Sequence, residues 1–263
     1  MIEIIILALI GSAVAGLWDL KTTEVPDELP YLMATFGIVY WLVSGSLSGD
    51  MTPFIFSMGF GAATLIIGFI LYKKKKMGGA DVWVPASILF MVPLYNSQIL
   101  AIPYFFNAIF VSAAYIIVYS LALGLKNTYI FSYFLDDMRK HIKWLASFAG
   151  VLIILVFIVF FYTDKIFITQ LEILLLVTIL ILFWRYAKVI EKKVFIKKIP
   201  VSELKVGDVV DDMEWRGLTA DDIKKIRKEK KYVTIKDGVR FVPVFPITLV
   251  VTLLYGNILF LMF

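Results

Sequence analysis

Residues 1–20, MIEIIILALIGSAVAGLWDL, decide the fold, because an apolar run of this length ends at one aspartate, Asp19. A helix needs ~20 apolar residues to cross the hydrocarbon core of a bilayer. The run has no basic segment at its start, and Glu3 is its one charge before Asp19. We therefore expect a retained first membrane span rather than a cleaved signal peptide.

The rest of the chain repeats this pattern. Its 263 residues are 60% hydrophobic and 16% aromatic, with a mean hydropathy of +0.87, and a water-soluble domain carries more charge and less apolar surface. These values predict an all-α polytopic membrane protein with about six to eight membrane helices. The fourth apolar run is short for a crossing, which predicts a short helix buried among the others. The runs cover residues 1–18, 31–47, 53–72, 82–94, 98–125, 145–163, 166–187 and 243–263.

The net charge of +5 is explained by the place of the basic residues, which cluster beside apolar runs. Cytoplasmic loops of membrane proteins carry an excess of Lys and Arg. We therefore expect a multi-pass protein of the cell membrane, with membrane lipid and no nucleic acid among its partners. The same rule places Asp19 and Asp81 at the cytoplasmic boundary. The basic clusters are Lys73 to Lys76, Arg139 to Lys143 and Arg185 to Lys198.

Residues 191–241 differ in kind from the apolar runs. IPVSELKVGDVV predicts short strands around a turn at Gly207, and LTADDIKKIRKEK predicts a helix with Thr219 at its N-cap. YVTIKDGVRFV predicts a hairpin that turns at Asp237-Gly238. We therefore expect a helical membrane domain over 1–190, a small α+β cytoplasmic domain over 191–241, and a C-terminal membrane helix over 242–263. In that helix, Pro243 and Pro246 of VPVFP mark the start.

The chain has no cysteine, which excludes disulfides, thiol chemistry and cysteine-based metal sites. Its one histidine, His141, lies among basic residues and argues against a histidine metal cluster or a serine–histidine triad. Three aspartate pairs lack the spaced oxygen ligands of a calcium loop, so we interpret them as solvated loops or helix starts. We expect no metal and no cofactor. These pairs are Asp136-Asp137, Asp211-Asp212 and Asp221-Asp222.

Asp19 ends the first apolar run and Asp81 opens the fourth, on the same predicted side of the membrane. Taken singly, each is explained as a helix-terminal carboxylate at the interface. An ionisable group at membrane depth needs a partner or a water-filled cavity. Two aspartates that face each other hold one proton between them, so the ionised member can activate water and the protonated one can act as an acid. Gly78 and Gly79 allow backbone angles and close approach that a side chain would block.

The stretches WDLKTTEVPD and MGGAD resemble the aspartic membrane proteases with a Gly-x-Gly-Asp motif. Within that class they most resemble the archaeal preflagellin peptidases. These are relatives of the type IV prepilin peptidases and, more distantly, of presenilin. The first family aspartate ends a span and is followed by a basic residue and then by Ile/Val-Pro-Asn/Asp. Here Asp19 is followed by Lys21 and by Val25, Pro26 and Asp27. The second matches Asp81, with Gly78 as the first motif glycine and Ala80 in place of the next one.

The resemblance implies a membrane aspartic endopeptidase that uses Asp19 and Asp81 to cut basic N-terminal leader peptides from archaeal preflagellin or pilin-like precursors at the cytoplasmic face. It implies no methyltransferase activity, because the zinc-binding cysteines of many bacterial relatives have no counterpart. The acidic residues between the first two runs offer a contact for a basic leader. These residues are Glu24, Asp27 and Glu28.

A second class of function uses the same two residues. A proton- or cation-coupled transporter could carry Asp19 and Asp81 as ion sites, on helices interrupted by glycine. A transporter site is expected near the bilayer midplane, with repeat symmetry between two halves. Both aspartates instead lie at a predicted boundary, and the sequence shows no internal repeat. The protease hypothesis is therefore favoured.

Overall fold

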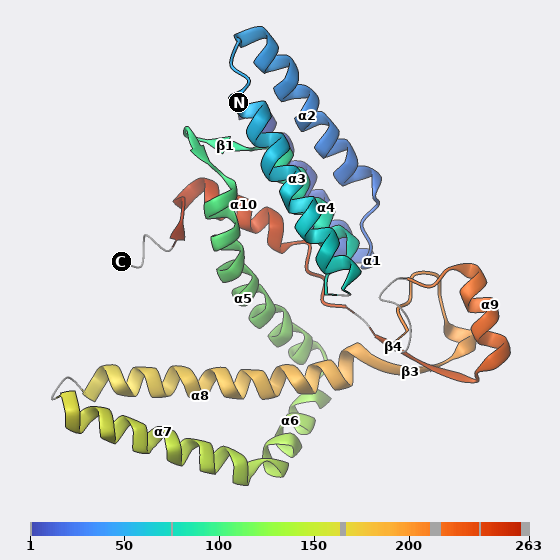
Figure 1. Ribbon diagram of the computed structural model, residues 1–263. Coiled ribbons are helices and arrows are strands. Elements are labelled where there is room, and N and C mark those ends of the chain that lie inside the picture. Colours follow the sequence, from blue (N-terminus) through green and yellow to red (C-terminus); the bar gives the residue numbers. More distant parts are fainter. Residues whose placement is uncertain (1, 75, 164–166, 211–216, 237, 259–263) are drawn as a thin grey trace. The chain divides into compact units, whose positions relative to one another are not determined.

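The computed structural model describes all residues except 1, 75, 164–166, 211–216, 237 and 259–263. The described residues form mainly helices, and their contacts divide the chain into two units (Figure 1). Unit 1 comprises residues 1–115, 204–229 and 238–263, and unit 2 comprises residues 116–203 and 230–237. The helices are α1 (Ile2–Thr22), α2 (Glu28–Ser48), α3 (Thr52–Lys73), α4 (Gly79–Met91), α5 (Ala101–Lys126), α6 (Tyr129–Lys140), α7 (Ile142–Thr163), α8 (Phe167–Ile190), α9 (Ala220–Glu229) and α10 (Val244–Tyr255), and the strands are β1 (Leu94–Tyr95), β2 (Gln98–Ile99), β3 (Ile196–Pro200) and β4 (Tyr232–Lys236).

The predicted all-α polytopic membrane fold is confirmed. Within the described residues, α1, α2, α3 and α5 are long and apolar enough to cross a membrane. They have 21, 21, 22 and 26 residues, close to or above the length that a span requires. Shorter apolar helices include α4 and α10. In unit 1, α1, α2, α3 and α4 pack side by side (Figure 1).

The predicted short, buried fourth helix is confirmed as α4, which has 13 residues. It packs against α2 and α3, and from Val84 to Met91 every side chain is buried. Two glycines of α3 permit this contact: a Cβ atom on Gly61 would lie 2.5 Å from the Phe90 ring, and one on Gly68 would lie 2.5 Å from Val82. Small residues let helix backbones approach closely in membranes, so α3 fixes α4 along its length.

The C-terminal end of α4 is also held by hydrogen bonds. Carbonyls in the last turn of a helix have no partner within the helix. Here the indole N–H of Trp41 on α2 donates to the Met91 carbonyl at 2.9 Å, and the Ser57 hydroxyl on α3 donates to the Phe90 carbonyl at 2.6 Å. Near its other end, Pro85 has no N–H with which to close the helical bond to the Asp81 carbonyl. The last turn of α4 is therefore anchored more firmly than the first.

The predicted final helix forms as α10, which begins directly after Pro243, and residues 259–263 lie outside the described part. A fully buried amide, Asn107 on α5, holds its far end. The Asn107 side-chain N–H groups donate to the Thr252 hydroxyl at 3.0 Å and to the Gly256 carbonyl at 2.6 Å, and its oxygen accepts the Ile258 N–H at 3.0 Å. This side chain therefore ties the C-terminal end of α10 to α5.

In unit 2, α7 and α8 lie side by side (Figure 1), and β3 pairs antiparallel with β4, from Ile196 opposite Lys236 to Pro200 opposite Tyr232. The predicted hairpin at Asp237-Gly238 is therefore wrong: Asp237 lies outside the described residues, and the partner of β4 precedes it in sequence. The predicted helix with Thr219 at its N-cap is confirmed, since the Thr219 hydroxyl accepts the Asp222 N–H at 3.3 Å.

The segment 191–241 is shared between the units. Residues 204–229, which include α9, cluster with unit 1, whereas β3 and β4 belong to unit 2. The boundaries of a separate small domain over 191–241, and of the domains over 1–190 and 242–263 that flank it, stay predictions.

Candidate active site

Asp19 lies in the last turn of α1 and is buried, with 6% of its surface exposed. Its carboxylate oxygen Oδ2 accepts the backbone N–H of Val242 at 3.0 Å. Val242 lies in the connection that leads into α10, which packs against α1. A buried carboxylate needs such a partner, because burial without hydrogen bonds is costly.

The connection before α10 is fastened both to α1 and to α5. Gly16 permits the approach, since a Cβ atom there would lie 3.1 Å from the Cα of Pro243. The Arg240 guanidinium donates to the Leu20 carbonyl at 2.6 Å, and the Tyr115 hydroxyl donates to the Arg240 carbonyl. The Arg240 charge also acts on the Asp19 carboxylate. Residues 240–243 and the end of α1 thus form one structure around Asp19.

Asp81 is the third residue of α4 and is partly buried. Its Oδ2 accepts the N–H of Gly78 at 3.2 Å, which is the position from which an acidic side chain reaches back to the start of a helix. Gly78 is extended, with φ −76° and ψ 163°, and a Cβ atom there would lie 3.2 Å from Asp81 Oδ2. At Gly79 the space around a Cβ atom is open.

These glycines therefore contribute space rather than unusual backbone angles. The described glycines with positive φ are Gly49, Gly207 and Gly256, and neither Gly78 nor Gly79 is among them. The extended backbone at Gly78 lets its N–H point at Asp81, and the open surface at Gly79 leaves the start of α4 accessible.

The structure brings the two predicted aspartates together in unit 1. Their helices, α1 and α4, are in contact, and the charge of Asp19 acts on Asp81. Among the contacts of the described residues, no hydrogen bond joins the two carboxyl groups. Each is held instead by a backbone N–H from another part of the chain or from its own helix start. Two carboxyl groups near one another, each with an anchored oxygen, can share a proton and position a water molecule.

The acidic residues between α1 and α2 have different surroundings. The Glu24 carboxylate lies against Gly207, which has φ +97° and donates its N–H to the Leu218 carbonyl at 3.0 Å. Asp27 and Glu28, at the start of α2, are exposed. Glu24 therefore lies close to the turn at Gly207, and all three acidic residues are exposed.

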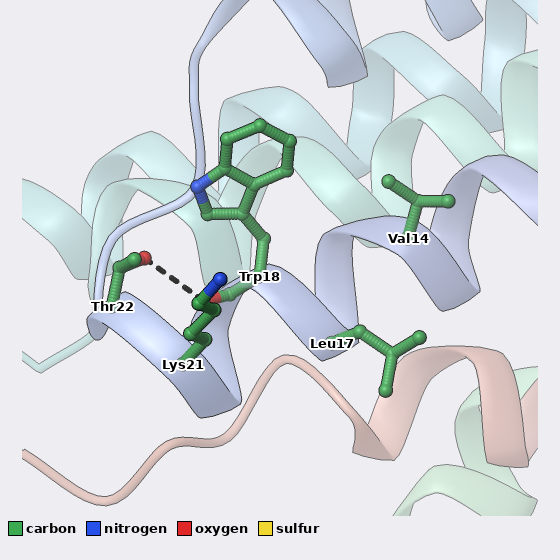
Figure 2. A pocket seen from close by; sticks show the side chains of 5 residues that line it. All are labelled: Val14, Leu17, Trp18, Lys21 and Thr22. Atoms are coloured by element: carbon green, nitrogen blue, oxygen red, sulfur yellow. Dashed lines mark hydrogen bonds between the residues drawn. The ribbon is translucent and has the colours of Figure 1, made fainter.

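The outer face of α1 beside Asp19 is hollowed by a shallow pocket, whose lining comes from this one helix (Figure 2). The Thr22 hydroxyl donates to the Trp18 carbonyl at 2.9 Å, a bond within the last turn of the helix. Leu17 is 66% exposed and Trp18 is 47% exposed. The lining residues are Val14, Leu17, Trp18, Lys21 and Thr22.

Among the described residues, no group of three or more His, Asp or Glu side chains could hold a metal ion. Asp211-Asp212 lie outside those residues. His141 is part of a different arrangement: Arg185 on α8 pairs with Asp137 on α6, with Nε 2.8 Å from Oδ2, and its Nη2 lies 2.6 Å from His141 Nδ1. The sequence predicted a basic patch here and missed this partly buried ion pair.

Residues 6–126 match the family model described as the type IV leader peptidase family. The match covers most of α1, all of α2 to α5 and both aspartates, and it supports the resemblance to leader peptidases that the sequence suggested. No curated protein and no solved structure matches the chain. Arg240 and Val242 lie outside the matched residues; VPVFP was noted in the sequence only as a helix start.

Proposed function

From the match of residues 6–126 to the type IV leader peptidase family, we propose that this chain cuts basic N-terminal leader peptides from archaeal preflagellin or pilin-like precursors, with Asp19 and Asp81 as catalytic residues and water as the nucleophile. The observation that carries the proposal is the juxtaposition of two carboxyl groups from α1 and α4 inside the matched region.

The reaction needs one proton on the pair. The ionised aspartate takes a proton from water, whose oxygen bonds to the carbonyl carbon of the scissile peptide. The protonated aspartate first donates a hydrogen bond to the carbonyl oxygen and then gives its proton to the amide nitrogen as the C–N bond breaks. A proton passes back between the aspartates and restores the starting state. The chain supplies every proton step from these two groups.

The predicted position of the site favours a substrate with a charged segment followed by an apolar segment. Asp19 and Asp81 adjoin apolar helices on one side and lysine-rich or acidic connections on the other. A precursor with a charged leader followed by an apolar helix would place its cleavage site between those environments. Cleavage at the cytoplasmic face follows from the same distribution of Lys and Arg. Asp27 and Glu28 are exposed where a basic leader would approach, and opposite charges favour the encounter.

The test is cleavage of a preflagellin-type precursor by membranes that carry wild type, Asp19→Asn or Asp81→Asn at matched expression. Asparagine keeps the size of the side chain and removes its ability to exchange a proton. Asp50→Asn is the matched control, because Asp50 is exposed, accepts the Thr52 N–H at 2.9 Å and lies at the far end of α2. We expect cleavage by wild type and Asp50→Asn and none by the other two. Cleavage by both active-site variants would refute the mechanism and direct attention to proton-coupled uptake.

A further inference from the structure

The two aspartates are held unequally. Asp19 accepts the Val242 N–H at 3.0 Å, and the Arg240 cation acts on it. Asp81 accepts the Gly78 N–H at a longer 3.2 Å, and its charged neighbour is Asp19; the two carboxylates repel each other when both are ionised. These are the charged and hydrogen-bonding groups that act on the pair among the described residues. Lys21 at the end of α1, and Asp27 and Glu28 at the start of α2, are exposed to solvent.

This asymmetry decides which member of the pair carries the shared proton. A hydrogen-bond donor and a nearby cation both stabilise a carboxylate relative to the neutral acid, whereas the repulsion between the two carboxylates acts equally on both. Resting on the proposed function, we infer that Asp19 is the ionised member that takes the proton from water, that Asp81 carries the shared proton, and that Arg240 is a positioning residue that maintains this division.

Arg240 acts through structure as well as charge. Its guanidinium donates to Leu20, one residue beyond Asp19, and its carbonyl accepts the Tyr115 hydroxyl. These contacts fix the backbone that presents the Val242 N–H to Asp19. Cations are favoured near the carbonyl end of a helix, so the same side chain stabilises the end of α1.

The first experiment compares Arg240→Met with Arg240→Lys in steady-state cleavage over a range of pH. For Arg240→Met we expect kcat to fall about 10- to 100-fold, at or below the low end of the roughly 10²- to 10⁴-fold contribution of a general acid or base, with KM within about twofold of wild type. We expect the acidic limb of the kcat profile to move to higher pH by about one unit, because the carboxylate loses its cation. Lysine keeps the charge, so Arg240→Lys should restore kcat to within about fivefold of wild type. Equal losses in both variants, with no movement of the pH profile, would overturn the inference.

The second experiment removes the N–H. Val242→Pro deletes this donor, and a residue that precedes a proline is already biased toward extended angles. Val242→Ala is its matched control, since it shortens the buried side chain but keeps the N–H. We expect kcat of Val242→Pro to be at least tenfold below that of Val242→Ala. Equal activity of the two would refute a role for the hydrogen bond.

A third measurement does not depend on cleavage. Hydrogen exchange of the backbone around Val242, in detergent, should speed up in Asp19→Ala, because the Val242 N–H loses its acceptor. Exchange unchanged from wild type would overturn the Asp19–Val242 contact even if no precursor is ever cut. If exchange responds as expected but wild type cuts no precursor, the proposed function fails and the contact stands.

Discussion

The position of Asp81 depends on a glycine one helix away, and Gly68→Ala tests this dependence. A Cβ atom on Gly68 would lie 2.5 Å from Val82 Cγ1 and 3.2 Å from both Val82 Cβ and Cγ2. Carbon atoms in good contact are about 3.5–4.0 Å apart. Val82 must therefore retreat by about 1 Å, and Asp81 is its neighbour in the same helical turn. Since the last turn of α4 is anchored by Trp41 and Ser57, the first turn has to move.

The expected cost follows from that displacement. A misplacement of about 1 Å in an active site can cost about 100-fold in rate, and overpacking lowers the free energy of unfolding by about 1–3 kcal/mol. Alanine is a better helix former than glycine, so helix propensity alone would predict a gain. We therefore expect Gly68→Ala to cut a precursor about 100-fold more slowly than wild type and to unfold at lower temperature in detergent.

Two further variants separate the clash from other causes. In Gly59→Ala the same change is made on the same helix where a Cβ atom meets open space, so its rate and melting temperature should match wild type. In the double variant Gly68→Ala with Val82→Ala, both Cγ atoms are gone, and most of the lost rate should return. The reasoning fails if Gly68→Ala cuts as fast as wild type, or if Gly59→Ala is equally slow.

Two predictions concern stability in detergent, measured by thermal or denaturant unfolding. Asn107→Leu leaves the Gly256 carbonyl and the Ile258 N–H without their partner, so the free energy of unfolding should fall by about 2–3 kcal/mol; a change below 0.5 kcal/mol would contradict the role of Asn107 as an anchor. Arg185→Met leaves the Asp137 carboxylate without the Arg185 guanidinium, so the free energy of unfolding should fall by about 3 kcal/mol. When Arg185→Met is combined with Asp137→Asn, the loss should be smaller than for Arg185→Met alone. A double variant less stable than either single variant would refute this account of the pair.

Local features of the active site were predictable from the sequence. The apolar run that ends at Asp19 defines the end of α1, and the glycines before Asp81 define the start of α4. Each is a signal carried by neighbouring residues, so the place of each aspartate at a helix terminus was predictable. The length of the fourth run likewise predicted a buried helix, because 13 residues cannot span a bilayer.

Long-range partners were not predictable in the same way. The turn signal at Asp237-Gly238 favoured pairing of residues on either side of it, but Tyr232–Lys236 pairs with Ile196–Pro200. Turn propensity favours a change of direction, while the choice of partner strand depends on which edge the rest of the fold presents. The contact between Arg185 and Asp137 was likewise not predictable from the sequence. Each residue lies in a charged cluster, and such clusters are expected at helix ends and membrane boundaries without any contact between them.

The contact between Val242 and Asp19 is also a long-range contact, and it determines what holds Asp19 in place. It joins residues 223 positions apart in sequence, and its donor is a backbone N–H, which every residue except proline provides. No side-chain pattern can therefore predict it. The contact places Asp19 under the control of residues outside the matched region 6–126. Asp81, in contrast, is held by Gly78 within its own helix start. One half of the pair is thus held by a local motif and the other by the connection into α10, so changes in residues 240–243 can shift Asp19 without a change in either aspartate.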